Sequence, residues 1–232
     1  MSTYVFPPAP VASLPVRGSE QRYPVQRIFC VGRNYAAHVR EMGADPDREP
    51  PLYFCKAPAH LHLAGGSMNY PQGTTDLHYE MELVVALGQP VANATPDQVR
   101  GAIWGYACGI DMTRRDLQAV ARKGGMPWDL AKDFEQGAVI GELVPVATTG
   151  QIDAGRIALS VNGQMRQQAD LSDMIWSVPE IIANLSHFYH LQPGDLIYTG
   201  TPEGVGAVAV GDKVVGEIEG VGTVTLDIAA AA

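Results

Sequence analysis

The sequence has little lysine, an excess of acidic residues and no long hydrophobic run, and each shortage excludes a class of protein. Lysine and arginine together number 16 against 25 aspartates and glutamates, which gives a formal net charge of −9. This balance disfavours nucleic acid as a partner, because a nucleic-acid-binding domain usually presents a basic face. No run of about 18 apolar residues occurs, so no membrane-spanning helix and no membrane partner are predicted.

Cysteine is also scarce, and its spacing is uninformative for metal binding or cross-linking. Cys30, Cys55 and Cys108 are far apart and form no C-x-x-C pair, which fits neither a disulfide framework nor a zinc knuckle. The N-terminal residues lack the basic segment and the uninterrupted apolar stretch of a secretory signal. We therefore expect a soluble, cytoplasmic protein.

Three nucleotide-binding and hydrolase motifs are missing as well: G-x-G-x-x-G, G-x-x-x-x-G-K-[ST] and G-x-S-x-G. The sequence thus gives no sign of a Rossmann, P-loop or α/β-hydrolase site. Glycine (25) and proline (17) are abundant, which implies many turns and excludes a helical bundle. Short β-rich runs at 195–199, 213–218 and 223–228, with few short helices between strands, predict an α+β, β-rich roll or sandwich.

The length of 232 residues suits one large domain. Residues 1–25 are proline-rich with little periodicity, and we expect them to form a short N-terminal arm packed on the body. Residues 26–232 are expected to form the main domain. The polar, proline-rich segment 44–51 is predicted to be a mobile loop.

A pair of carboxylates is the sharpest chemical feature. Residues 77–87 alternate as a strand does, so Leu77 and Tyr79 would share the core face while His78, Glu80 and Glu82 share the other. Two carboxylates on one face repel unless a cation neutralises them. A solvated strand face would explain the pattern equally well, whereas the alternative is a site for Mg²⁺ or Mn²⁺.

A third carboxylate, Asp111, ends the buried-looking run 103–110 just before a predicted helix start at Thr113. It could complete a cation site, or it could be a loop aspartate that caps the helix. His60, His62 and His78 show no H-x₃-H or H-E-x-x-H spacing, and we interpret them as surface or packing histidines.

His38 and Glu41 are three residues apart in a predicted helical stretch and are therefore neighbours. A carboxylate beside an imidazole raises its basicity, which is how a histidine becomes a general base for water. A simple surface contact would give the same spacing. The position just before the proline-rich loop would suit a lid over a substrate.

Two further segments could contact an anion. Lys132 lies in an apolar stretch that gives little reason for an ammonium group, although its side chain could reach the surface. The glycine-rich turn at 199–206 could present backbone N–H groups and Thr201 to an anion.

Five motifs together resemble the fumarylacetoacetate hydrolase family, in the order found there. They are GRNYAAHVREMG (32–43), DLHYEMELVVALG (76–88), GIDMTRRDLQ (109–118), GMPWDLAKDF (125–134) and LIYTGTPEGVG (196–206). The resemblance covers residues 27 to 228, and the chain has the size of the family's small members. It implies a mixed β-sandwich roll of the type found in the C-terminal domain of fumarylacetoacetate hydrolases, a catalytic domain at 26–232, and a homodimer.

The resemblance also implies roles for individual residues. A divalent metal, Mg²⁺ or Mn²⁺, would be held by Glu80, Glu82 and Asp111. The catalytic residues would be His38 and Glu41, in a lid that orders on ligand binding, together with Lys132. Substrate-lining positions would be Lys56, Arg115, Gln118 and Thr201. One departure is visible, because a Lys-Pro pair of relatives is Lys56-Ala57-Pro58 here.

The implied activity is metal-dependent hydrolysis of a 2,4-dioxo acid (acylpyruvate), with 3-fumarylpyruvate as the preferred substrate. His38 would take a proton from water, the hydroxide would attack C4, and the C3–C4 bond would break to leave a pyruvate enolate facing the metal and Lys132. The alternatives are an oxaloacetate-type decarboxylase, a hydroxymuconate-type isomerase or decarboxylase, and a non-catalytic binder that keeps the metal pocket.

Overall fold

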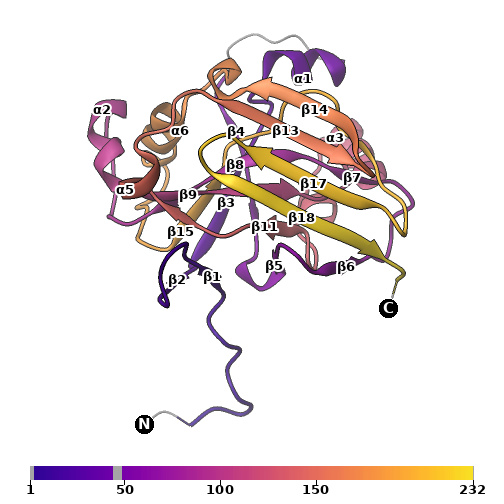
Figure 1. Ribbon diagram of the computed structural model, residues 1–232, viewed down its shortest axis with the longest axis horizontal. Coiled ribbons are helices and arrows are strands. Elements are labelled where there is room, and N and C mark those ends of the chain that lie inside the picture. Colours follow the sequence, from indigo (N-terminus) through magenta and orange to yellow (C-terminus); the bar gives the residue numbers. More distant parts are fainter. Residues whose placement is uncertain (1–2, 44–48, 232) are drawn as a thin grey trace.

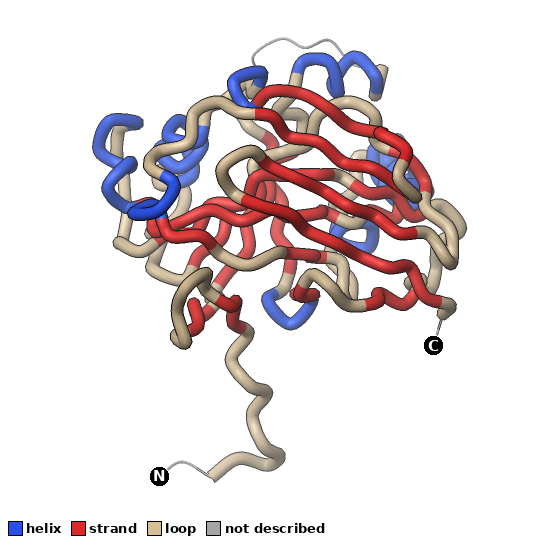
Figure 2. The backbone as a smooth tube through the Cα atoms, in the orientation of Figure 1, coloured by secondary structure: helices blue, strands red, loops and turns tan. Residues whose placement is uncertain are grey.

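The computed structural model describes residues 3–43 and 49–231 and shows two packed β-sheets with short helices at their margins (Figures 1 and 2). The larger, mixed sheet runs in the order β4 (Leu52–Lys56), β3 (Arg27–Gly32), β15 (Asp195–Tyr198), β8 (Met81–Leu87), β9 (Ile103–Asp111), β11 (Ala138–Ile140) and β5 (Leu61–Leu63), with β12 (Val144–Pro145) paired to β9. The second sheet runs β14 (Gln164–Asp170), β13 (Arg156–Val161), β17 (Lys213–Ile218), β18 (Gly222–Ala229) and β6 (Ser67–Asn69).

Smaller elements complete the fold. Two short sheets consist of β10 (Thr113–Arg114), β7 (Leu77–Tyr79) and β16 (Gly206–Ala207), and of β1 (Ser13–Pro15) with β2 (Arg22–Pro24). The helices are α1 (Ala36–Glu41), α2 (Pro96–Val99), α3 (Arg115–Gly124), α4 (Asp129–Lys132), α5 (Val146–Thr149) and α6 (Val178–Leu185), with 3₁₀ turns at Pro58–His60, Arg100–Ala102 and Leu171–Asp173. The predicted β-rich α+β roll is therefore confirmed.

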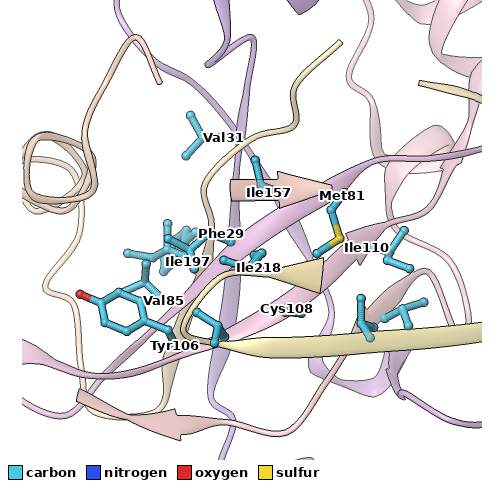
Figure 3. Packing of buried hydrophobic residues seen from close by; sticks show 14 of the residues in the cluster. Phe29, Val31, Met81, Val85, Tyr106, Cys108, Ile110, Ile157, Ile197 and Ile218 are labelled. Atoms are coloured by element: carbon cyan, nitrogen blue, oxygen red, sulfur yellow. The ribbon is translucent and has the colours of Figure 1, made fainter. Parts of the chain in front are cut away.

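The main core lies between the two sheets (Figure 3). Met81 and Val85 of β8 and Ile110 of β9 pack there with Ile157 and Ile218 of the second sheet. Each such side chain contributes about 1.5–3 kcal/mol through burial. The alternate residues of β8 face a second apolar cluster, so β8 is buried on both faces, and any carboxylate on it lies away from bulk water.

The second apolar cluster includes the β1–β2 hairpin. Leu14 and Tyr23 are buried there, and the Tyr23 hydroxyl donates to the Leu87 carbonyl at 2.6 Å. The expected N-terminal arm is thus packed on the body only from about residue 13, whereas Tyr4 and Phe6 are exposed on a segment that extends away from it (Figure 1). The division into an arm at 1–25 and a domain at 26–232 stays a prediction.

The predicted strand at 77–87 is divided at Glu80. β7 pairs with β10 and β16 in one small sheet, whereas β8 pairs with β9 and β15 in the larger sheet. The chain changes sheet between Tyr79 and Met81, because its two halves find different partners. Glu80 therefore lies at the junction of the two sheets, a position that no alternating pattern reveals.

The helix start predicted at Thr113 is wrong, because Thr113 lies in β10 and α3 begins at Arg115. Ser177 and Glu180 form a capping box at the start of α6, in which both the amide and the hydroxyl of Ser177 donate to the Glu180 carboxylate. α6 ends at Leu185, so Phe188 is exposed and does not share its buried face. α3 ends at Gly124 and is followed by Gly125, whose φ of 61° is left-handed. Within the described ranges, none of the helices is long and apolar enough to cross a membrane.

Candidate active site

Glu80, Glu82 and Asp111 lie together because of strand register. β8 and β9 are antiparallel, with Met81 opposite Ile110 and Glu82 opposite Gly109. One step further, Asp111 is opposite Glu80, and the Asp111 amide donates to the Glu80 carbonyl at 2.8 Å. One oxygen from each of the three carboxylates lies within 4.8 Å of the others, and all three side chains are buried. The predicted metal-ligating set is thus brought together in space.

Lys132, at the end of α4, connects two of these carboxylates. Its buried Nζ donates to Glu80 Oε2 at 2.6 Å, to Asp111 Oδ2 at 2.6 Å and to Thr113 Oγ1 at 2.7 Å. Burial favours the neutral amine, but the Asp111 and Glu80 charges raise the pKa of Lys132 above its usual value. Lys132 is therefore an ammonium group whose three N–H donors are all directed at protein oxygens.

Two further cations balance the cluster. Arg115, the first residue of α3, donates to Glu80 Oε1 at 2.5 Å and to Gln118 Oε1 at 2.5 Å. Lys56, the last residue of β4, has its Nζ 2.8 Å from Asp111 Oδ1. Burial opposes ionisation of Glu80, but the Lys132 and Arg115 charges hold its pKa well below the usual value. Glu80 is therefore ionised.

Glu82 is different, because it has no ion pair with any described residue. Its carboxylate accepts the Gly200 amide at 2.7 Å. Burial, together with the neighbouring Asp111 and Glu80 carboxylates, raises the pKa of Glu82 well above its usual value. A further positive charge beside Glu82 would offset the burial and the repulsion that oppose ionisation of its carboxylate.

These features fit a divalent cation. Three buried carboxylates supply the hard oxygen ligands that Mg²⁺ and Mn²⁺ prefer, and three protein ligands leave coordination positions for water or substrate. Glu82 is the side chain whose surroundings most require added positive charge. The donor set therefore agrees with the metal site that the sequence predicted.

The His38–Glu41 pair of α1 lies at the same place. His38 Nδ1 is 3.2 Å from Glu41 Oε2, and the His38 ring is buried. Glu41 also accepts the Gly204 amide at 3.0 Å, which ties α1 to the glycine-rich turn. The His38 side chain also lines the cavity described below. Residues 44–48 of the predicted mobile loop lie outside the described residues.

A cavity joins most of the predicted residues. Those that line it are His38, Glu80, Glu82, Arg115, Gln118, Lys132 and Thr201, with Val31, Gly32, Arg33, Met42, Phe54, Arg122 and Trp128. Asp111 does not line the cavity, because it is fully buried and bonded to Lys132. Lys56 was expected to contact substrate. Its buried ammonium instead pairs with Asp111 and donates to the carbonyls of Met112 and Lys132. The structure therefore does not bring Lys56 to the cavity wall.

Gln167 is a residue that the sequence did not single out. It is fully buried on β14, and its side-chain amide donates to Thr201 Oγ1 at 2.9 Å and to the Pro202 carbonyl at 2.8 Å. Its oxygen accepts the Met81 amide at 3.0 Å, between the two glutamates. Gln167 thus holds Thr201 against the carboxylate-bearing strand. It occurs in a polar segment of the chain, where no local pattern marks it.

The turn after β15 requires glycine at position 200. Its φ of +99° is left-handed, and a Cβ there would lie 2.7 Å from Asn34 Cβ. This close approach allows the Gly200 amide to reach Glu82. Asn34 fixes the turn from the other side, because its Nδ2 donates to the Thr199 carbonyl at 2.8 Å.

Fold and site together define a member of a known hydrolase class. Residues 27–229 match the family described as fumarylacetoacetate (FAA) hydrolase, C-terminal, so the chain belongs to this family. It is 52% identical over 189 residues to a fumarylpyruvate hydrolase of Ralstonia sp., a match that covers 81% of this chain and 98% of the relative. It is also 38% identical over 205 residues to an oxaloacetate tautomerase of Escherichia coli (strain K12), covering 88% of this chain and 93% of that one.

A solved structure agrees with this assignment. The crystal structure of fumarylpyruvate hydrolase from Pseudomonas aeruginosa in complex with Mn²⁺ and pyruvate superposes with a TM-score of 0.96 at 46% identity. The match covers 98% of this chain and all of that one. Sequence and fold therefore agree over the whole region that contains the cavity.

Proposed function

We propose that this protein is a metal-dependent acylpyruvate hydrolase that converts 3-fumarylpyruvate and water to fumarate and pyruvate. The observation that carries the proposal is the buried set of Glu80, Glu82 and Asp111 beside the His38–Glu41 pair, around one cavity. Support comes from the Ralstonia relative and from the related structure that holds Mn²⁺ and pyruvate, since pyruvate is the product common to all acylpyruvates.

The three carboxylates would hold Mg²⁺ or Mn²⁺. When bound, the cation supplies a Lewis acid that polarises the substrate's oxygens and offsets developing negative charge. This chain's residues orient the reacting groups. Arg115, Gln118 and Thr201 line the cavity close to the carboxylates and are placed to contact the pyruvate end of a substrate.

His38 would act as the general base. It accepts a proton from water, the resulting hydroxide adds to C4, and the C3–C4 bond breaks, with its electron pair going to C3. Protonation of C3 gives pyruvate, and C4 becomes the new carboxyl carbon of fumarate. Glu41 orients the His38 ring through Nδ1, and the Gly204 amide in turn holds Glu41.

Lys132 would offset the charge on the departing pyruvate carbanion, and its contacts with Glu80 and Asp111 give it a second task. It forms hydrogen-bonded ion pairs with two buried carboxylates and so holds them in position. Lys56 supports Asp111 from below, and we propose this positioning role for it in place of direct substrate contact.

The wider setting follows from the same substrate. Fumarylpyruvate is a ring-cleavage product, so the enzyme would serve gentisate-type aromatic catabolism in the cytoplasm. We also propose that it works as a homodimer. Light scattering on the purified protein tests the dimer directly, with a monomeric mass as the contrary result.

A second candidate is the tautomerisation of oxaloacetate, which the Escherichia coli relative favours. This reaction moves a proton between C3 and the C2 oxygen and breaks no C–C bond. It would need the metal and a proton carrier but no hydrolytic water. The decarboxylase and hydroxymuconate alternatives stay untested predictions.

The deciding experiment incubates the purified protein with Mn²⁺ or Mg²⁺ and with fumarylpyruvate, acetylpyruvate or oxaloacetate in turn. Pyruvate is measured with lactate dehydrogenase, and fumarate by chromatography. The proposal predicts equal amounts of pyruvate and fumarate from fumarylpyruvate, and little pyruvate from oxaloacetate. Enol-to-keto conversion of oxaloacetate without hydrolysis of either acylpyruvate would instead support the tautomerase.

A further inference from the structure

The cavity is more basic than the chain that forms it. The formal net charge is −9, yet Arg33, Arg115, Arg122 and Lys132 all line this one cavity. Arg115 and Lys132 are paired with Glu80. Within the described residues, the guanidinium groups of Arg33 and Arg122 form neither an ion pair nor a side-chain hydrogen bond. An unpaired guanidinium group on a cavity wall is well suited to a carboxylate, because its planar donors match both oxygens.

Helix α3 places Arg122 in line with the residues proposed to contact pyruvate. Arg115, Gln118 and Arg122 are three and four residues apart, so they share one face of the helix, and all three line the cavity. Arg122 lies seven positions after Arg115, which corresponds to about 10 Å along the helix axis. Arg115 touches Glu80, so Arg122 marks the far end of this face.

The proposed substrate has matching dimensions. Fumarylpyruvate has seven carbons and a carboxylate at each end, and its extended chain spans about 7 Å. With the pyruvate end beside Glu80, the other carboxylate extends along α3, within reach of a long arginine side chain from the second turn. We infer that Arg122 binds the distal carboxylate and selects dianionic acylpyruvates over monoanionic ones. This inference rests on the proposed function.

Arg33 is the second candidate on the same wall, and the structure ranks it lower. Arg122 is half-buried, whereas Arg33 is exposed at the end of β3 with a left-handed φ of 60°. A charge pair is stronger where water is partly excluded. Arg122 should therefore dominate, with Arg33 adding a weaker attraction that salt screens more readily.

Kinetics with two substrates test this assignment. Arg122→Gln should lower kcat/KM for fumarylpyruvate by about 10- to 100-fold, the loss expected for hydrogen bonds to a charged group. The same variant should change acetylpyruvate hydrolysis much less, because that substrate has no distal carboxylate. Arg122→Lys should recover part of the loss, and Arg33→Gln should lose less than Arg122→Gln. Lys123→Gln is the matched control, since it removes an exposed positive charge from the next position.

Binding provides a readout that is independent of turnover. 2-Oxoheptanedioate and 2-oxoheptanoate are equally long, differ in the distal carboxylate and have no C4 carbonyl to hydrolyse. In calorimetry with Mn²⁺, the wild-type protein should bind the diacid more tightly, and Arg122→Gln should remove that preference while leaving the monoacid's affinity nearly unchanged.

The outcomes separate the inference from the function on which it rests. If the wild-type protein hydrolyses both acylpyruvates while Arg122→Gln leaves fumarylpyruvate unaffected, the distal-carboxylate assignment is wrong and the proposed function stands. Equal losses for both substrates in Arg122→Gln would also overturn the distal-carboxylate assignment, because they would indicate a general electrostatic effect. If the wild-type protein hydrolyses neither substrate, the proposed function itself fails.

Discussion

Asp111 is paired with Glu80 across two neighbouring antiparallel strands, and its amide donates to the Glu80 carbonyl at 2.8 Å. Their side chains therefore start from adjacent points of the sheet and meet the same lysine, because Lys132 Nζ lies 2.6 Å from each. Backbone register thus fixes the separation of two carboxylates that would otherwise repel. The consequences of this arrangement can be measured.

Replacing Lys132 should weaken the metal-free fold and make it more dependent on metal. In Lys132→Met, Glu80 and Asp111 lose a buried partner, and we expect the free energy of unfolding to fall by about 3 kcal/mol. Arg115 and Lys56 limit the loss. Urea unfolding with EDTA and with Mn²⁺ should show that Mn²⁺ stabilises the variant more than the wild type.

The control is Lys123→Met, which removes an exposed lysine. Its stability should be unchanged in both conditions. Equal stability of Lys132→Met and wild type in EDTA would contradict the charge-balancing role of Lys132.

His38 should matter for water activation more than for carbanion stabilisation. His38→Ala should lower acylpyruvate hydrolysis by about 10²- to 10⁴-fold, the loss typical of a missing general base. Any decarboxylation of oxaloacetate should fall much less, because it needs no activated water. Steady-state rates on both substrates decide the matter. Intact hydrolysis would exclude His38 as the base, and equal loss of both reactions would assign it to closure or a shared proton transfer.

Gln167 should act through position rather than contact with substrate. Gln167→Leu leaves the buried Met81 amide and Thr201 hydroxyl without this partner, so we expect a loss of about 1–3 kcal/mol in unfolding free energy. A shifted Thr201 should also lower kcat. The neighbouring exposed Gln168→Leu serves as the control. If Gln167→Leu keeps wild-type stability and kcat, the link between β14 and the site is unimportant.

His62 should make the fold sensitive to mild acid. Its Nε2 is buried and has no hydrogen-bond partner among the residues that the structure describes, and burial lowers the pKa of His62 below its usual 6.5. The unfolded chain therefore takes up this proton more readily than the folded protein. Stability is unaffected above about pH 7 and falls as the pH drops through about 6.5.

The test compares melting temperatures at pH 7 and pH 5. His62→Gln should show a smaller decrease than the wild type, whatever its stability at pH 7. His190→Gln, at an exposed position, should behave as the wild type. An identical decrease in all three proteins would refute the account.

Local patterns in the sequence marked several of the candidate residues that the structure gathers around the cavity, because these residues occur in short runs with recognisable chemistry. Glu80 and Glu82 are two apart in a run with strand-like alternation, and His38 and Glu41 are three apart on a helix, so the local spacing already marked each pair as a candidate. The family resemblance then indicated how these pairs and Asp111 belong together. The antiparallel register of β8 and β9 places Asp111 there in the structure.

What the sequence could not provide depends on distant packing. Gln167 and Glu80 lie 87 positions apart in the chain, and only the packing of the second sheet on the larger one brings the Gln167 side-chain oxygen to the Met81 amide, between the two glutamates. The change of sheet at Glu80 depends on which strands are available as partners. The contacts of Lys56 with Asp111 and with two backbone carbonyls depend on tertiary packing in the same way, and its expected contact with substrate stays a prediction.

Anomalous diffraction from crystals grown with Mn²⁺ tests the central claim most directly. The account predicts one strong peak per chain, coordinated by carboxylate oxygens of Glu80, Glu82 and Asp111, and its loss in Glu82→Gln crystals grown in the same way. A peak bound elsewhere, or hydrolysis that persists with no Mn²⁺ or Mg²⁺ in the protein, would contradict it.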